Sequence, residues 1–165
     1  MSVVVTSQFG LSVVETLETQ IDGAANPAVT FDDFNASYYL DGAGTGGTPV
    51  VTKKASFIQA LTAGVATIDM TSLPATGGGT FSAAGLRLIE MLLHNPTTNA
   101  GLINFAPGAA NPLPLFGTGN DIDIHLGARL HWHSNNQGVD ISGTVKTIDL
   151  AGTGTDVLWC LFVFG

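Results

Sequence analysis

The sequence predicts an all-β protein, a single-domain antiparallel β-sandwich of the jelly-roll type. Clusters of Gly and Pro recur at short intervals, and the runs between them are rich in Val, Ile, Thr and Phe. Many short strands separated by such turns are typical of a sandwich or jelly roll. The 165 residues are expected to form one domain. Within it, residues 1–50 either extend as an N-terminal arm or belong to the sandwich.

The turn clusters set the order of the predicted strands. The clusters fall at residues 23–27, 41–49, 74–79, 107–114, 117–119 and 152–154. Gly and Pro supply backbone geometry that turns need and strand interiors avoid. The strands predicted between them cover residues 11–19, 36–40, 54–62, 65–70, 86–94, 101–105, 121–126, 130–133, 143–150 and 157–164.

One segment, residues 82–94, has two interpretations. As a helix it would be capped by Ser82 and would stop before Pro96, with Arg87 and Glu90 paired one turn apart. As a strand it would begin at Leu86. Gly85 and the β-rich surroundings favour the strand.

The last predicted strand, residues 157–164, is apolar on both faces. Trp159, Leu161 and Val163 point one way, and Leu158, Cys160, Phe162 and Phe164 point the other. A strand of this kind must be covered on both sides. We therefore expect either a central strand of the sandwich or a surface completed by another subunit. The candidate interface residues are Trp159, Leu161, Phe162, Val163 and Phe164.

The composition is unusually poor in charge. Only 11% of the residues are charged, against about 25% in ordinary soluble domains. A surface with so few charges suits a protein that packs against neighbours. The five Lys and Arg residues are scattered and the net charge is −8, which excludes nucleic-acid binding as a class. We expect no membrane span, because no apolar run reaches about 18 residues, and no secretory signal, because residues 1–5 (MSVVV) contain no charged n-region.

Histidines and aspartates gather in residues 121–133 (DIDIHLGARLHWH). A hairpin turning at residues 127–129 would keep the apolar residues on the core face. The side chains of Asp123, His125, His131 and His133 would then share the other face. Such a set is a weak candidate for binding Zn²⁺ or Ni²⁺. The favoured alternative is a polar face that is solvated or packed on a neighbour, so no metal or other cofactor is expected.

The sequence offers no arrangement for nucleophilic catalysis. A Gly-x-Ser-x-Gly elbow is missing, and Cys160 has no basic neighbour in its strand to activate it. The carboxylate pairs at Asp32 with Asp33 and at Asp121 with Asp123 are typical of turns and strand edges. We therefore expect a protein that is not an enzyme.

Several motifs occur in a fixed order from Lys53 onward. They are residues 67–74 (TIDMTSLP), 95–100 (NPTTNA), 106–111 (APGAAN), 139–140 (VD) and 146–154 (KTIDLAGTG), followed by the apolar final strand. In this pattern the chain resembles a poorly characterised group of tailed-phage virion proteins. The resemblance covers about two-thirds of the chain and consists of turns and strands. The pair His131 and His133 departs from it.

The resemblance implies a β-sandwich bound to the phage particle, as a capsid decoration (cement) protein. Such a protein would be made in the host bacterial cytoplasm and reside on the capsid surface of the virion. Its partners would be copies of itself, with a trimer favoured, and the major capsid protein. No catalytic residues follow from the resemblance.

A second hypothesis is a tail-associated or adhesin-type module that binds glycans or a host surface. It predicts exposed aromatic and Asn or Asp side chains, either around Tyr38 and Tyr39 or within residues 131–136. Exposed aromatic side chains in a protein of this kind are otherwise expected at subunit contacts.

Overall fold

The computed structural model describes residues 51, 53–75, 79–117, 119–134 and 138–165 in full. It also gives the backbone of two short strands, β1 (Val5–Gln8) and β2 (Ser37–Leu40), which pair antiparallel with each other. The strand predicted at residues 36–40 is thus confirmed. The strand predicted at residues 11–19, and the choice between an arm and a sandwich element for residues 1–50, lie outside the described residues.

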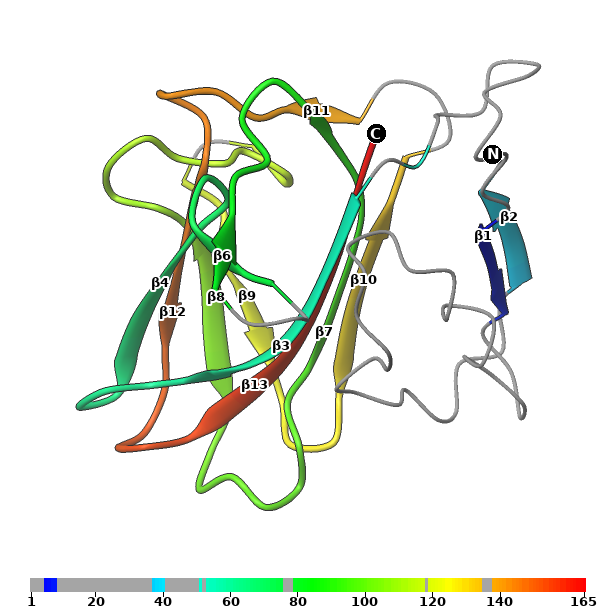
Figure 1. Cartoon of the computed structure of the whole chain (residues 1–165). Coiled ribbons are helices and arrows are strands. Elements are labelled where there is room, and N and C mark those ends of the chain that lie inside the picture. The colour runs from blue at the N-terminus through cyan, green and yellow to red at the C-terminus, as the bar shows by residue number, and fades with distance from the viewer. Residues whose placement is uncertain are drawn as a thin grey trace.

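Residues 51–165 form an all-β sandwich of two antiparallel sheets (Figure 1). The five-stranded sheet has the order β10 (Arg129–His133), β7 (Arg87–His94), β13 (Val157–Phe164) and β3 (Lys53–Ala60), and β11 (Val139–Asp140) also pairs with β7. The four-stranded sheet has the order β4 (Val65–Asp69), β12 (Thr147–Ala151), β8 (Ile103–Pro107) and β9 (Ile122–Ile124). A small hairpin joins β5 (Leu73–Pro74) to β6 (Thr80–Phe81). No helix that could cross a membrane occurs among these residues.

The main strands pair from the outside of the chain inward. The first, β3, pairs with the last, β13; β4 pairs with β12, β7 with β10, and β8 with β9. The chain therefore follows the path of one long hairpin folded across two sheets. Four connections pass between the sheets at one end of the sandwich, at the bottom of Figure 1. We call this the crossover end and define it by the loops 61–64, 95–102, 125–128 and 152–156.

The core lies between the two sheets and is rich in phenylalanine. The rings of Phe57 and Phe162 are stacked with centroids 5.9 Å apart, and Phe105 meets Phe116 edge-on at 5.8 Å. Burying each side chain of this size stabilises the fold by about 1.5–3 kcal/mol. The inward positions of β13, Leu158, Cys160, Phe162 and Phe164, are all part of this core.

Strand β13 is central, and both of its faces are covered. On the face turned away from the core, Leu161 and Val163 are buried and Trp159 is half-buried. The expectation of a central strand is therefore confirmed. The prediction that Phe162 and Phe164 contact another subunit is wrong, because both side chains lie inside the sandwich. Among the candidate interface residues, Trp159 has the largest exposure.

The ambiguous segment is the strand β7, not a helix. It begins after Gly85, whose φ of 81° lies in the left-handed region that a right-handed helix does not use. Six consecutive residues, 88–93, are buried between neighbouring strands on both sides. Helical spacing and strand spacing fit this apolar run equally well, and pairing with β10 and β13 stabilises the strand.

Candidate functional site

The loops of the crossover end are bonded to one another through their backbones. Leu61 N donates to Asp156 O at 2.8 Å, and Gly152 N donates to Gly64 O at 2.8 Å. At Gly64 φ is +82°, and a Cβ there would lie 2.8 Å from the carbonyl oxygen of Gly152. The two loops approach so closely that a side chain at Gly64 would push them apart.

Buried and half-buried side chains hold the remaining loops of this end. Asn95 Nδ2 donates to Ile124 O at 2.7 Å, and Asn99 Nδ2 donates to Val157 O at 2.6 Å. In return Val157 N donates to Asn99 Oδ1 at 3.0 Å. The carboxylate of Asp156 accepts a bond from Ala100 N at 2.8 Å. Because these polar groups bind loops from both sheets, the crossover end is a preorganised surface.

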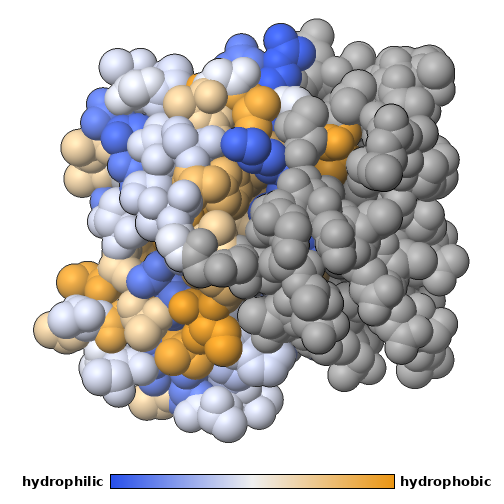
Figure 2. Space-filling model, in the orientation of Figure 1, coloured by the Kyte–Doolittle hydropathy of each residue, from blue (hydrophilic) through white to orange (hydrophobic). Residues whose placement is uncertain are grey.

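The large hydrophobic side chains that are exposed in the described part of the chain all belong to this end. They are Ile58, Val65, Leu102 and Leu126, with exposures between 40% and 59%. Each lies in a crossover loop or within three residues of one. In Figure 2, hydrophobic side chains are visible toward the lower end of the described surface. Several exposed hydrophobic residues at one end of a domain make that end a candidate surface for binding other proteins or ligands.

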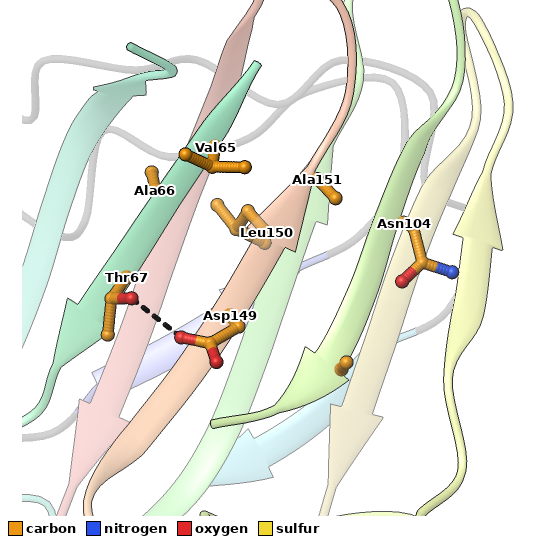
Figure 3. Close-up of a pocket in the computed structure, with 8 residues that line it drawn as sticks. Val65, Ala66, Thr67, Asn104, Asp149, Leu150 and Ala151 are labelled. Atoms are coloured by element: carbon orange, nitrogen blue, oxygen red, sulfur yellow. Dashed lines mark hydrogen bonds between the residues drawn. The ribbon is translucent and has the colours of Figure 1, made fainter. Parts of the chain in front are cut away.

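A shallow hollow of about 270 Å³ lies on the outer face of the four-stranded sheet (Figure 3). It begins at Val65 and extends over small side chains, Ala106 and Ala151, toward Thr67 and Asp149. Thr67 Oγ1 donates to Asp149 Oδ1 at 2.6 Å. The other oxygen of Asp149 accepts a bond from Ala109 N at 2.7 Å. The polar groups of the hollow are thus bonded within the protein, as structural groups of an exposed sheet face are.

The predicted hairpin at residues 121–133 is wrong, and with it the candidate metal cluster. Strand β9 pairs with β8 in one sheet, and β10 pairs with β7 in the other. Asp123 accepts a bond from Asn104 on the four-stranded sheet, and His125 is exposed just beyond β9. His131 and His133 lie on the five-stranded sheet. Among the described residues, no three His, Cys, Asp or Glu side chains are close enough together to hold a metal ion.

A different polar cluster lies on the outer face of the five-stranded sheet, the face turned away from the core. Its centre is Glu90 on β7, which is 1% exposed. His131 Nε2 lies 3.3 Å from Glu90 Oε1, and neither carboxylate oxygen accepts a hydrogen bond from the described residues. Burial raises the pKa of Glu90, against the opposing effects of His131 and His133. The sequence analysis gave Glu90 no such role.

The surroundings of two further residues, His94 and Cys160, shift the pKa values of their side chains. The ring of His94 meets that of Trp159 edge-on at 5.2 Å; burial, assisted by the charge of Arg129, lowers the pKa of His94. Burial strongly raises the pKa of the Cys160 thiol, which is enclosed in the core. A thiol in such surroundings stays protonated and is a poor nucleophile.

The chain matches no known protein family, and none of the curated proteins is significantly similar to it in sequence.

Proposed function

We propose that the chain is a non-enzymatic structural protein of a tailed-phage virion, a capsid decoration protein that self-associates and binds the major capsid protein. The motifs of residues 67–154 and the low charge of the chain support this assignment. We further propose that the assembly is a trimer on the capsid surface, formed after synthesis in the host bacterial cytoplasm.

The pairing order of the strands adds support. First-with-last pairing across two sheets is the order expected of a jelly roll, and this is the arrangement that we assign to the chain. Jelly rolls are frequent among viral capsid domains. A fold alone does not specify a function, so this support is an analogy.

The observation that carries the proposal is the crossover end. Its exposed hydrophobic side chains are Ile58, Val65, Leu102 and Leu126, and buried Asn and Asp side chains fix the loops that bear them. A rigid apolar surface loses little conformational entropy on binding, so most of the apolar area buried contributes to affinity. On a capsid lattice, repetition would make even a modest contact effective.

Two measurements test the proposal. The first is the copy number of the protein in purified phage particles, by quantitative mass spectrometry. A decoration protein is expected in hundreds of copies, as many as the lattice positions it covers. A few copies per particle would instead assign the protein to the tail.

The second measurement is binding to purified capsid shells that lack the protein, by co-sedimentation. The double variant Leu102→Ser/Leu126→Ser is expected to bind about tenfold more weakly or worse, since two apolar anchors are lost. The matched control is Ala84→Ser/Ala110→Ser, which changes exposed residues in loops at the opposite end of the sandwich. Equal binding by both double variants would exclude the crossover end as the docking surface.

The alternative function, a tail-associated or adhesin-type glycan-binding module, is favoured by one observation. The hollow of the four-stranded sheet combines a floor of small side chains with hydroxyl, amide and carboxylate groups from Thr67, Asn104 and Asp149. Jelly rolls also occur among lectins. A glycan array tests this alternative. The absence of any binding, together with a high copy number in the particle, would eliminate it.

A further inference from the structure

Glu90 lies in a row of directly paired residues that crosses the five-stranded sheet on its outer face. Its Cα pairs with that of His133 on β10 and with that of Val163 on β13, and Val163 pairs in turn with Lys54 on β3. Residues directly opposite each other across antiparallel strands share a face. The neighbouring inward positions on β7, Met91 and Leu93, belong to the core. Glu90 therefore points away from the core and is nevertheless almost fully buried.

A buried carboxylate is stable only when its charge is compensated or when it carries a proton. For Glu90 the nearest compensating group is His131, whose Nε2 lies 3.3 Å from Glu90 Oε1. Backbone amides and hydroxyl groups of the described residues donate no hydrogen bond to either oxygen. Because no described group other than His131 compensates a negative charge here, burial favours the protonated form of the Glu90 carboxyl group.

Charged and titratable groups face Glu90 from each described neighbouring strand. On β10 these are His131 and His133, whose rings stack with centroids 6.4 Å apart, and Arg129 further along. Strand β13 contributes the neutral Val163, and β3 contributes Lys54 beyond it. On β7 itself the next titratable group is His94, at the end of the strand. Only His131 lies at ion-pair distance from Glu90 among the described residues.

We propose that a protonated Glu90 carboxyl group, in contact with His131, clasps the edge strand β10 to β7, and that the loss of the Glu90 proton as the pH rises loosens β10. Strand β10 stands at the end of the five-stranded sheet and pairs with β7. All five of its residues are partly exposed, whereas the central part of β7 is buried. Edge strands of this kind are the first parts of a sheet to open. The proposal concerns the fold itself and does not depend on the virion assignment.

The direction of the pH dependence follows from the pKa of Glu90, which burial raises above the ordinary value of a glutamate side chain. The folded protein therefore holds a proton at pH values where the unfolded chain has lost it. Its contribution to stability is complete below about pH 4.5 and is lost as the pH rises through the raised pKa.

The test compares the urea unfolding of the wild-type chain with that of Glu90→Gln from about pH 5 to about pH 8.5. One extra proton in the folded state changes the unfolding constant by up to about tenfold per pH unit. The ratio of the wild-type to the variant unfolding constant is therefore expected to grow by about tenfold or more between the ends of this range. His125→Gln, which alters an exposed histidine outside the cluster, is the matched control and should leave the pH profile unchanged. Parallel profiles for wild type and Glu90→Gln would overturn the proposal.

Two readouts on the wild-type chain keep the proposal testable if Glu90→Gln fails to fold. Carbon-13 NMR of the Glu90 carboxyl group should show a titration above the usual range of glutamate. Native-state hydrogen exchange, corrected for the intrinsic effect of pH, should show faster opening of the β10 amides as the pH rises, while those of β13 stay protected. A carboxyl group that titrates normally, or exchange in β10 that does not depend on pH, would contradict the clasp.

Discussion

The outer faces of the two sheets differ in the burial and the hydrogen bonding of their polar side chains. On the four-stranded sheet, Thr67 and Asp149 are accessible to water and bonded to each other. On the five-stranded sheet, Glu90 is buried and accepts no hydrogen bond from the described residues. An antiparallel sheet commonly has one face on the core and one in water. The four-stranded sheet follows this rule, whereas the central strands of the five-stranded sheet, β7 and β13, are largely buried on both faces.

This difference separates two roles for polar residues in one fold. Where water and a bonded neighbour are both available, a carboxylate is energetically neutral and insensitive to its surroundings. Where both are missing, the same chemical group makes the stability depend on its protonation. Under the proposed clasp, the outer face of the five-stranded sheet is the part of the described structure whose stability falls as the pH rises.

The largest expected changes in the free energy of unfolding come from two substitutions in β13, which test whether the outer face of the five-stranded sheet is packed like a core. Phe162→Ala, on the inner face of β13, should lower the free energy of unfolding by about 3–5 kcal/mol. Leu161→Ala, on the outer face of the same strand, should lower it by about 2–5 kcal/mol, because Leu161 is buried as well. Urea unfolding measures both. A loss below about 0.5 kcal/mol for Leu161→Ala, as at a surface position, would show that the outer face is open to water.

The next prediction is a stabilisation: replacing Glu90 should raise the free energy of unfolding, whereas the two substitutions above lower it. Replacing buried ionic groups by apolar residues of similar volume is often stabilising, by about 1–4 kcal/mol. Glu90→Leu is accordingly expected to raise the free energy of unfolding by about 1 kcal/mol or more at alkaline pH, and by less at acidic pH, where the carboxyl group is already neutral. Destabilisation at alkaline pH would mean that the Glu90 carboxylate is compensated in the folded chain.

Asn95 provides the contrasting buried polar residue, because its amide is fully bonded. Its Nδ2 donates to Gly101 O and Ile124 O, and its Oδ1 accepts from Asn99. Asn95→Leu should lower the free energy of unfolding by about 1–3 kcal/mol for the unsatisfied groups it leaves behind. Unlike the change at Glu90, this loss should be the same at acidic and alkaline pH. Thermal unfolding at both pH values separates the two cases.

The smallest effect is expected on the outer face of the four-stranded sheet. Thr67→Ala removes the hydrogen bond to Asp149, which keeps its bond from Ala109 N. Because the site is exposed, the change in the free energy of unfolding should stay within about 0.5 kcal/mol. A loss of several times that size would indicate that this face is covered by other parts of a larger assembly.

Much of the strand pattern was predictable from the sequence, because β-branched and aromatic runs between turns are local signals. Strand β13 was predicted with its observed ends, since an apolar run on both faces indicates a central strand. Strands β5, β6 and β11 were not predicted. Each has two residues and no alternation of its own, and each forms because a neighbouring strand offers a partner.

The hairpin predicted at residues 121–133 was wrong because a local sequence pattern does not specify which strands pair with each other. The alternation of residues 121–133 fits a hairpin and fits a crossover between sheets equally well. The outcome depends on contacts with distant strands, such as Ile124 opposite Ile103 and Leu130 opposite Leu93. The position of Glu90 was missed for the same reason. One signal was available, a glutamate in the otherwise apolar run 88–93, but its partner, His131, lies 41 residues further along the chain.

The folded-hairpin path of the chain also bears on how the protein is made. Strand β13 lies between β3 and β7, so β3 lacks its partner in this sheet, and β7 has one unpaired edge, until residues 157–164 have left the ribosome. Before that moment their edges are open to pairing with other nascent chains. The sandwich must therefore close late and nearly all at once, and its yield in a cell should depend on temperature and on chaperones during synthesis more than on the stability of the finished fold.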